Sequence, residues 1–298
     1  MKHLITTKDL TNKEILSLYK DAKIFLDLQS NNTLQGKLIV TLFFENSTRT
    51  RSSFEIAAKR LGAAVVNLEV QTSSTKKGET VEDTVANLNA MKPDAIIIRH
   101  SDCGLPQSLT KHVNCPILNA GDGKNAHPTQ ALLDLFTIME HFNYNIENKH
   151  IGIIGDIANS RVASSNLELL PRFGLKPILI APKEFKVKSK FKSTTKINKV
   201  IDKLDIIMSL RVQHERHKIN ILPEELERSK QDYAKKYCIT KELIKNKNIL
   251  ILHPGPVNRN IDISDEILND KRSKILEQVQ NGVAVRMACL KKLIIDSK

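Results

Sequence analysis

A short run of hydroxyl and guanidinium side chains, Ser47-Thr48-Arg49-Thr50-Arg51, is the part of the chain best suited to hold a phosphate. Hydroxyl groups donate hydrogen bonds, and the guanidinium fork of an arginine can hold two phosphate oxygens at once. If a helix begins here, its first backbone N–H groups add donors and a partial positive charge. The structural alternative is a serine or threonine that caps a helix beside solvated arginines, and the run alone does not decide between the two.

The segments on either side of this run, called the phosphate motif below, indicate how it is positioned. Residues 38–44 are an apolar run typical of a buried strand, and residues 52–61 carry apolar side chains at helical spacing. The phosphate motif therefore lies where a strand ends and a helix begins. Other polar groups follow apolar runs in the same way: Arg99, His127-Pro128-Thr129-Gln130, Gly155-Asp156, Arg211 and His253-Pro254-Gly255-Pro256.

Apolar periodicity predicts alternating strands and helices along the whole chain. The expected strands cover residues 38–44, 64–68, 94–99, 115–120, 151–156, 177–180, 205–210 and 248–252. The expected helices cover residues 11–26, 52–61, 81–91, 105–112, 128–142, 161–173 and 270–293. This alternation is typical of parallel sheets covered on both faces, in which ligands bind outside the carboxyl ends of the strands.

The alternation restarts at Lys149, after a long helix. We therefore expect an α/β protein with two doubly wound parallel-sheet domains, residues 1–140 and residues 141–298, joined by that helix. We expect the final helix to pack back towards the first domain. The length of 298 residues is sufficient for two domains with cores of their own.

The net charge of +13 calls for an explanation, because it could mark a nucleic-acid partner or an acidic metabolite. Of the 46 basic residues 34 are lysines, and they are dispersed. The densest cluster, residues 183–199, contains only Phe185 and Phe191 as aromatic residues. No pattern of a known nucleic-acid-binding motif is present. We therefore expect a solvated lysine-rich surface and no nucleic-acid partner.

Neither a membrane segment nor a cysteine framework is expected. No apolar run reaches the length of a membrane-spanning helix, and the first residues lack the apolar core of a signal peptide. The four cysteines, Cys103, Cys115, Cys238 and Cys289, lie far apart and form no CxxC pair. We expect free thiols, no zinc site, no membrane partner and a cytoplasmic protein.

Taken in order along the chain, these motifs resemble those of the aspartate/ornithine carbamoyltransferase family. The phosphate motif, Arg99 and His127-Pro128-Thr129-Gln130 match its carbamoyl-phosphate site, and the resemblance covers essentially the whole chain. Each motif alone is weak, but their joint order is specific. Residues 76–80, 155–157, 160–163, 210–216 and 253–259 resemble the aspartate branch. The His-Cys-Leu-Pro segment of the ornithine branch has no counterpart, because no cysteine lies between Cys238 and Cys289.

The charges of the substrates favour the same branch. Aspartate carries two carboxylates and carbamoyl phosphate carries a dianionic phosphate, so a site for both requires several fixed cations. The chain supplies them in Arg49, Arg99, Arg161, Arg211 and Lys77. An ornithine site would need a carboxylate facing the side-chain amine, and none stands at the matching positions. Transfer to ornithine or a related amine remains the first alternative, and a non-catalytic nucleic-acid-binding protein or an inactive scaffold is the second.

The resemblance implies a role for each residue of the carbamoyl-phosphate site. Its phosphate is held by Ser47, Thr48, Arg49, Thr50 and Arg99. His127, together with Arg99 and Thr50, faces the carbonyl oxygen, where donors stabilise the negative charge that develops as the amine attacks. Gln130 and the backbone at Gly255 and Pro256 hold the carbamoyl amino group.

The resemblance likewise implies an aspartate site formed by Arg161, Arg211, Gln213 and Lys77, with Lys77 touching both substrates. The catalytic residues would be Arg49, Thr50, Lys77, Arg99 and His127. No metal or organic cofactor is needed, since orientation and electrostatics can drive the transfer and the leaving phosphate can take the proton. The product, N-carbamoyl-L-aspartate, belongs to an early step of pyrimidine synthesis.

A polar loop, residues 71–80, carries Lys77 but no apolar side chain that could anchor it to its own core. In the family, the positions matched by Ser73 and Lys77 reach into the active site of the neighbouring subunit. The resemblance therefore implies a homotrimer with shared active sites. A regulatory chain or a larger assembly stays open.

Overall fold

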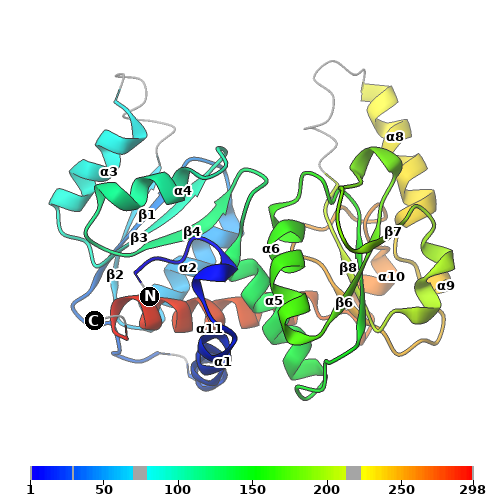
Figure 1. Cartoon of the computed structure of the whole chain (residues 1–298), viewed down its shortest axis with the longest axis horizontal. Coiled ribbons are helices and arrows are strands. Elements are labelled where there is room, and N and C mark those ends of the chain that lie inside the picture. The colour runs from blue at the N-terminus through cyan, green and yellow to red at the C-terminus, as the bar shows by residue number, and fades with distance from the viewer. Residues whose placement is uncertain (1, 29, 70–78, 213–222, 297–298) are drawn as a thin grey trace. The chain divides into compact units, whose positions relative to one another are not determined.

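The structure is a computed structural model that describes residues 2–28, 30–69, 79–212 and 223–296 (Figure 1). The chain divides into two compact units, which are Met1–Phe136 with Val279–Lys298 and Thr137–Gln278. Each unit is built on one parallel sheet with helices around it, so the predicted α/β class is confirmed. Most of the final helix, α11 (Ile275–Ile294), lies in the first unit, as expected.

The sheet of the first unit has the strand order β2-β1-β3-β4. Its strands are β1 (Leu38–Phe43), β2 (Ala64–Glu69), β3 (Ala95–His100) and β4 (Ile117–Asp122), and all neighbours run parallel. The chain moves outward from β1 to β2 and then, on the other side, from β3 to β4. The topological switch point therefore lies between β1 and β3, where ligands bind in open α/β sheets.

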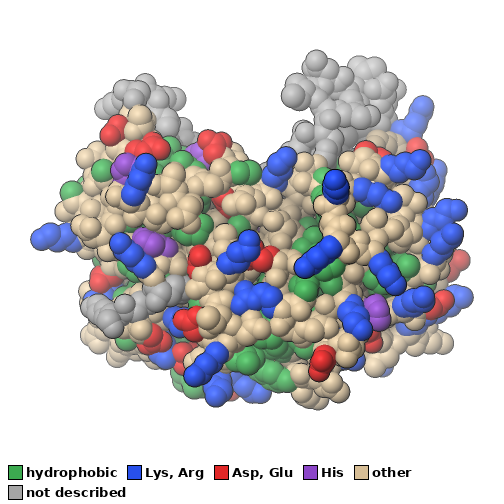
Figure 2. All heavy atoms as spheres, in the orientation of Figure 1, with side chains coloured by type: hydrophobic (Ala, Val, Ile, Leu, Met, Phe, Trp, Pro, Cys, Tyr) green, Lys and Arg blue, Asp and Glu red, His purple; other side chains and the backbone are tan. Residues whose placement is uncertain are grey.

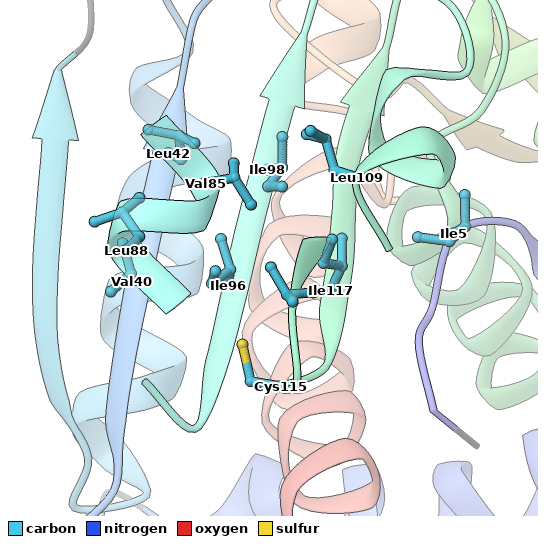
Figure 3. Packing of buried hydrophobic residues seen from close by; sticks show 11 residues of the cluster. Ile5, Val40, Leu42, Val85, Leu88, Ile96, Ile98, Leu109, Cys115 and Ile117 are labelled. Atoms are coloured by element: carbon cyan, nitrogen blue, oxygen red, sulfur yellow. The ribbon is translucent and has the colours of Figure 1, made fainter. Parts of the chain in front are cut away.

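Both faces of this sheet are covered. On one face, Val40 and Leu42 of β1 pack with Ile96 and Ile98 of β3 against α3 (Val81–Ala90) and α4 (Leu105–Leu109) (Figure 3). Figure 1 shows α2 (Thr48–Arg60) and α11 on the opposite face. Strands buried on both faces are near-continuous apolar runs, which is why the sequence pattern predicted them.

The remaining helices of the first unit begin where the sequence predicts. The first long helix, α1 (Asn12–Asp27), is opened by a capping box in which Glu14 N donates to Thr11 Oγ1 (3.2 Å) and Thr11 N donates to Glu14 Oε2 (2.9 Å). The short elements are η1 (Thr7–Asp9) and η4 (Thr110–His112). The helix α5 (Pro128–His141) starts at a proline, which suits a first turn, and continues into the second unit.

The sheet of the second unit has the strand order β7-β6-β5-β8-β9, again all parallel. Its strands are β5 (His150–Ile154), β6 (Lys176–Ile180), β7 (Lys192–Thr194), β8 (Ile206–Ser209) and β9 (Leu250–Leu252). The chain runs from β5 to β6 and β7 on one side and then to β8 and β9 on the other. The switch point of this sheet lies between β5 and β8.

Several smaller elements surround this second sheet. The helices are α6 (Arg161–Leu169), α8 (Pro223–Tyr237), α9 (Lys241–Ile244) and α10 (Asp265–Leu268). The single-turn elements are η5 (Leu170–Phe173), η6 (Lys183–Phe185), η7 (Ile197–Lys199) and η8 (Ile201–Lys203). The helix expected over residues 161–173 is thus divided into α6 and η5, because Pro171 lacks the backbone N–H that a continuous α-helix needs.

One prediction about the second half of the chain was wrong in detail. The final helix starts at Ile275 and not at residue 270. The residues between are held by β9, since Ile251 N donates to Arg272 O and Lys274 N donates to Ile251 O, both at 2.9 Å. The lysine side chains of the segment 183–199 are exposed, as expected for a solvated surface, and the same segment also contains β7 and buries Phe185 and Ile197.

Basic side chains are scattered over both units on the face in view and do not gather at one place (Figure 2). All four cysteines are free, with Cys115 and Cys289 buried. In the part of the chain that the structure describes, no helix has the length and apolar character required to cross a membrane.

Candidate active site

The phosphate motif lies where the sequence predicts, between the end of β1 and the first turn of α2. Ser47 occupies the N-cap position, but its side chain makes no capping hydrogen bond. Thr48 and Arg49 are exposed, whereas Ser47 and Thr50 are half-buried. A first turn that its own cap residue does not satisfy can offer its N–H groups to an anion, so the local geometry favours the phosphate interpretation.

Arg99 stands at the end of β3, directly beside Phe43 of β1 in the sheet register. Its Nε donates to Glu45 Oε2 at 3.1 Å, and its NH1 donates to Ala120 O at 3.3 Å. The two side chains of the ion pair are mostly buried, with exposed fractions of 13% for Arg99 and 18% for Glu45. Arg99 is therefore held at the switch point of the first sheet, where an incoming anion must compete with Glu45 for its donors.

His127 is positioned by a buried carboxylate at the end of β4. Asp122 Oδ1 accepts from Asn119 Nδ2 (2.7 Å) and from Ala126 N (3.1 Å), and its Oδ2 accepts from Gly104 N (2.6 Å) and Asn125 Nδ2 (2.8 Å). These bonds fix the loop that leads into α5. His127 itself is buried, and its carbonyl accepts the first backbone bonds of the helix.

A glycine in the same loop leaves no room for a side chain. Gly123 has a φ of +45°, and a Cβ there would lie 2.5 Å from both Ser101 O and Cys103 Sγ. The loop after β3 therefore packs directly against the loop after β4, and only glycine permits this approach.

Gln130 lies in the first turn of α5 and is buried. Its Nε2 donates to Asp134 Oδ1, one turn further along the helix, at 2.8 Å. An amide whose nitrogen is held in this way can offer its oxygen as an acceptor. The amino group of a carbamoyl is a donor that such an oxygen would bind.

The second unit carries its predicted residues at the carboxyl edge of its own sheet. After β5, Ser160 Oγ accepts from Ala163 N at 3.1 Å and caps α6, whose first residue is the buried Arg161. A cation at a helix N-terminus opposes the helix dipole, so this position is better explained by an anionic ligand than by helix stability. Arg211 follows β8, the neighbour of β5, and is half-buried.

A buried histidine orders the loop after β9. His253 Nδ1 accepts from Gly255 N at 2.8 Å, and its Nε2 lies 3.2 Å from Asp262 Oδ2. The first contact requires Nδ1 to be the acceptor, so Nε2 carries the proton and donates to Asp262. Asn258 N also donates to Asp262 Oδ2, at 2.9 Å. The backbone at Gly255 and Pro256, which are joined by a cis peptide bond, is thereby held in place.

The structure thus brings the predicted residues together in two sets. The carboxyl edge of the first sheet carries Ser47, Thr48, Arg49, Thr50, Arg99, His127 and Gln130. The carboxyl edge of the second sheet carries Arg161, Arg211, Gly255 and Pro256. The predicted Ser73, Lys77 and Gln213 lie outside the described residues. Among the described residues, no cluster of three or more His, Cys, Asp or Glu side chains could hold a metal ion.

Several supporting residues were missed by the sequence analysis, namely Glu45, Asp122, Asp134 and Asp262. Asp122 and Asp134 carried a signal, because each is a lone carboxylate within an otherwise apolar or glycine-rich segment. Glu45 and Asp262 carried no such signal, since only the fold pairs Glu45 with Arg99 and Asp262 with His253.

Two doubly wound sheets, each with cations at its carboxyl edge, define a two-domain α/β protein whose candidate site is suited to anionic small molecules. The carbamoyl-phosphate-binding domain of the aspartate/ornithine carbamoyltransferases matches residues 2–140, and their Asp/Orn-binding domain matches residues 147–293. The chain therefore belongs to the aspartate/ornithine carbamoyltransferase family.

Relatives within this family are close and cover the whole chain. The chain is 64% identical to the aspartate carbamoyltransferase catalytic subunit of Aliarcobacter butzleri and 61% identical to that of Campylobacter lari, over 100% of each chain. Among solved structures, it is similar to the catalytic subunit of M. jannaschii aspartate transcarbamoylase, with a TM-score of 0.88, 34% identity and 99% of each chain covered. It is also similar to Trypanosoma cruzi aspartate transcarbamoylase in complex with carbamoyl phosphate and aspartate, with a TM-score of 0.87, 29% identity and coverage of 98% of this chain and 95% of the other.

Proposed function

We propose that the protein transfers the carbamoyl group of carbamoyl phosphate to the amine of L-aspartate, giving N-carbamoyl-L-aspartate and phosphate. The observation that carries the proposal is that the two sheets present different sets of polar residues at their carboxyl edges. One presents a phosphate motif and a held amide, and the other presents two arginines suited to carboxylates. The names of the full-length relatives support the same reaction.

The phosphate would be bound by the first turn of α2 together with Thr48, Arg49 and Thr50, and by Arg99 once its donors turn from Glu45 to the substrate. A phosphate group provides several acceptor oxygens, which match the hydroxyl, guanidinium and N–H donors assembled there. Ser47 adds a hydroxyl at the N-cap. Binding would therefore fix the leaving group before the amine arrives.

The chemical step would join the amine nitrogen to the carbonyl carbon and break the bond between that carbon and the phosphate oxygen. His127, Arg99 and Thr50 would stabilise the carbonyl oxygen as it becomes negative, while Gln130 and the backbone of Gly255 and Pro256 hold the carbamoyl amino group. The amine must be neutral to attack, and the proton that it loses would pass to the leaving phosphate.

Arg161 and Arg211 would bind the two aspartate carboxylates, because guanidinium groups hold carboxylates in a bidentate fashion. On the sequence alone, Lys77 would contact both substrates and Gln213 would belong to the aspartate site. The sequence has no acidic residue at the positions expected to face a side-chain amine, so ornithine is the less favoured acceptor. The test is phosphate release from carbamoyl phosphate with each amine in turn, and release with ornithine but none with aspartate would refute the assignment.

We further propose a cytoplasmic homotrimer in which Lys77 serves the active site of a neighbouring subunit. The absence of an apolar anchor in residues 71–80 supports this sharing, and the four free thiols suit a reducing compartment. Mixing Arg49→Ala and Lys77→Ala chains tests it, because a hybrid trimer would regain sites with both residues intact. Hybrids that form but stay inactive would contradict shared sites.

A further inference from the structure

A buried arginine on α11, Arg286, contacts the helix that carries the phosphate motif. Its NH1 donates to Ser53 Oγ of α2 at 2.9 Å. Its guanidinium also lies over the ring of Phe54, the next residue on α2, with 5.0 Å between Cζ and the ring centroid. A desolvated cation over an aromatic face is a favourable contact. Arg286 therefore binds α2 directly behind the turn that is proposed to hold the phosphate.

Arg286 also faces the helix that carries Gln130. Asp134, the buried partner of the Gln130 amide, acts electrostatically on Arg286. Burial lowers the pKa of Arg286 to about 10, which Cys289 and Asp134 partly oppose, so the guanidinium stays charged at neutral pH. Burial also raises the pKa of the Cys289 thiol to about 12, so that thiol stays neutral. Of the two groups that favour the charged guanidinium, Asp134 is the one on α5.

The helix α11 makes room for this guanidinium. Gly282 lies one turn before Arg286, and a Cβ at that position would be 2.6 Å from Arg286 NH1 and 3.0 Å from Leu133 Cδ2. Glycine is a poor helix former, so its presence inside α11 lowers helix propensity. What the glycine provides is the space in which the guanidinium reaches Ser53.

Fastening α11 to the first unit does not require a buried charge. Lys291 and Lys292 already join α11 to α1, through Asp21 at 2.8 Å and Glu14 at 3.1 Å. A buried ion is expensive to desolvate, and well-packed apolar side chains often stabilise a protein as well. The placement of Arg286 between α2 and Asp134 therefore suggests a role in the site that these helices build.

We propose that Arg286 is a positioning residue, which binds Ser53 and balances Asp134 so that the phosphate motif and Gln130 are aligned before carbamoyl phosphate binds. The inference rests on the proposed function, in which these two groups hold one substrate. Groups on different helices bind one ligand best when the helices are held in advance, because no ordering is then required on binding. Arg286 acts through α2 and α5 and touches no substrate.

Three variants separate this role from general stability. Ser53→Ala removes the acceptor on α2 and little else. Gly282→Ala displaces Arg286 NH1 while it improves the helix propensity of α11. Arg286→Lys keeps the charge beside Asp134 but lacks the fork that reaches Ser53. The matched control is Lys291→Met, which removes a tie from the same helix to α1.

The primary measurement is the dissociation constant of inorganic phosphate by titration calorimetry, at a temperature at which circular dichroism shows every variant to be folded. Ser53→Ala and Gly282→Ala should weaken phosphate binding and raise the KM for carbamoyl phosphate by about 3- to 10-fold, which is the size of the effect of one ordinary hydrogen bond. Arg286→Lys should do so by about tenfold or more. At saturating carbamoyl phosphate the KM for aspartate should change by less than about twofold, because the arginines proposed to bind its carboxylates belong to the second unit, whereas Arg286 and Ser53 belong to the first.

Lys291→Met should leave all of these constants unchanged even where it lowers the melting temperature. Wild-type phosphate binding in both Ser53→Ala and Gly282→Ala would overturn the inference, as would an equal weakening by Lys291→Met. If the wild-type protein carbamoylates no aspartate, the proposed function fails, but the phosphate titrations still decide the role of Arg286.

Discussion

Replacing Glu45 by glutamine tests whether an anion competes with this carboxylate for Arg99. In the structure, Arg99 Nε donates to Glu45 Oε2 at 3.1 Å. A phosphate that recruits Arg99 must displace this contact, and the like charge of Glu45 opposes its approach. Glu45→Gln keeps the size of the side chain and an acceptor oxygen but removes the charge. We therefore expect phosphate to bind more tightly to the variant.

The size of the effect follows from the burial of the pair. A hydrogen bond to a charged group contributes about 1.5–3 kcal/mol, and a neutral acceptor retains roughly half of this. The side chains are 13% and 18% exposed, so solvent screens the interaction only in part. If the interaction that competes with phosphate is weakened by about 1 kcal/mol, the dissociation constant of phosphate should fall roughly fivefold.

The assay is calorimetric titration with inorganic phosphate at low ionic strength. The matched control is Glu55→Gln, which changes the net charge equally but weakens a more exposed pair with Lys59 on α2, at 2.6 Å, whose side chains are 29% and 62% exposed. The control should leave the dissociation constant within about twofold, because exposed pairs contribute little. Unchanged or weaker phosphate binding in Glu45→Gln would refute the competition between Glu45 and the anion.

Three further predictions concern catalysis, aspartate binding and stability. His127→Ala should lower kcat by about 100- to 1,000-fold with little change in carbamoyl-phosphate binding, and near-normal turnover would exclude His127 as an oxyanion donor. Arg211→Ala should raise the KM for aspartate by about 10- to 100-fold and leave the carbamoyl-phosphate dissociation constant unchanged, whereas equal loss of both would contradict its assignment to aspartate. Hydrogen bonds from Arg272 lower the pKa of Asp270 from 3.8 to about 2, so its stabilisation is complete above pH 3.8 and is lost as the pH falls through 2. Urea unfolding should therefore show that Asp270→Asn lowers the free energy of unfolding by about 1–2 kcal/mol at pH 7. This difference from the wild type should shrink below about pH 4, and a difference that does not change with pH would show that the carboxylate plays no part.

The sequence predicted most of the fold because most of its strands, such as β1, β4 and β8, are buried on both faces. Apolar runs such as residues 95–98 leave little ambiguity, and the capping box at Thr11 marks a helix start. The weakly apolar elements were missed, among them β7 with its exposed Lys192 and the polar helix α8. Their positions depend on packing within the second unit, which no local pattern records.

The candidate site was predictable where local sequence defines it. The phosphate motif joins a strand to a helix, and His127 precedes a proline that starts α5. The residues that support the site were not predictable, because their partners are remote. Arg99 meets Glu45 across 54 positions and Arg286 meets Ser53 across 233. Only the solitary charge of Arg286 within the apolar segment 283–290 hinted at such a contact.

The choice of acceptor amine is the most direct test of the proposed reaction. Purified protein is mixed with carbamoyl phosphate and either L-aspartate or L-ornithine, and both phosphate and the carbamoylated product are measured. The two arginines of the second unit, Arg161 and Arg211, predict N-carbamoyl-L-aspartate and phosphate in equal amounts with aspartate, and neither above background with ornithine. Citrulline formation from ornithine without any carbamoyl-aspartate would contradict the proposed function.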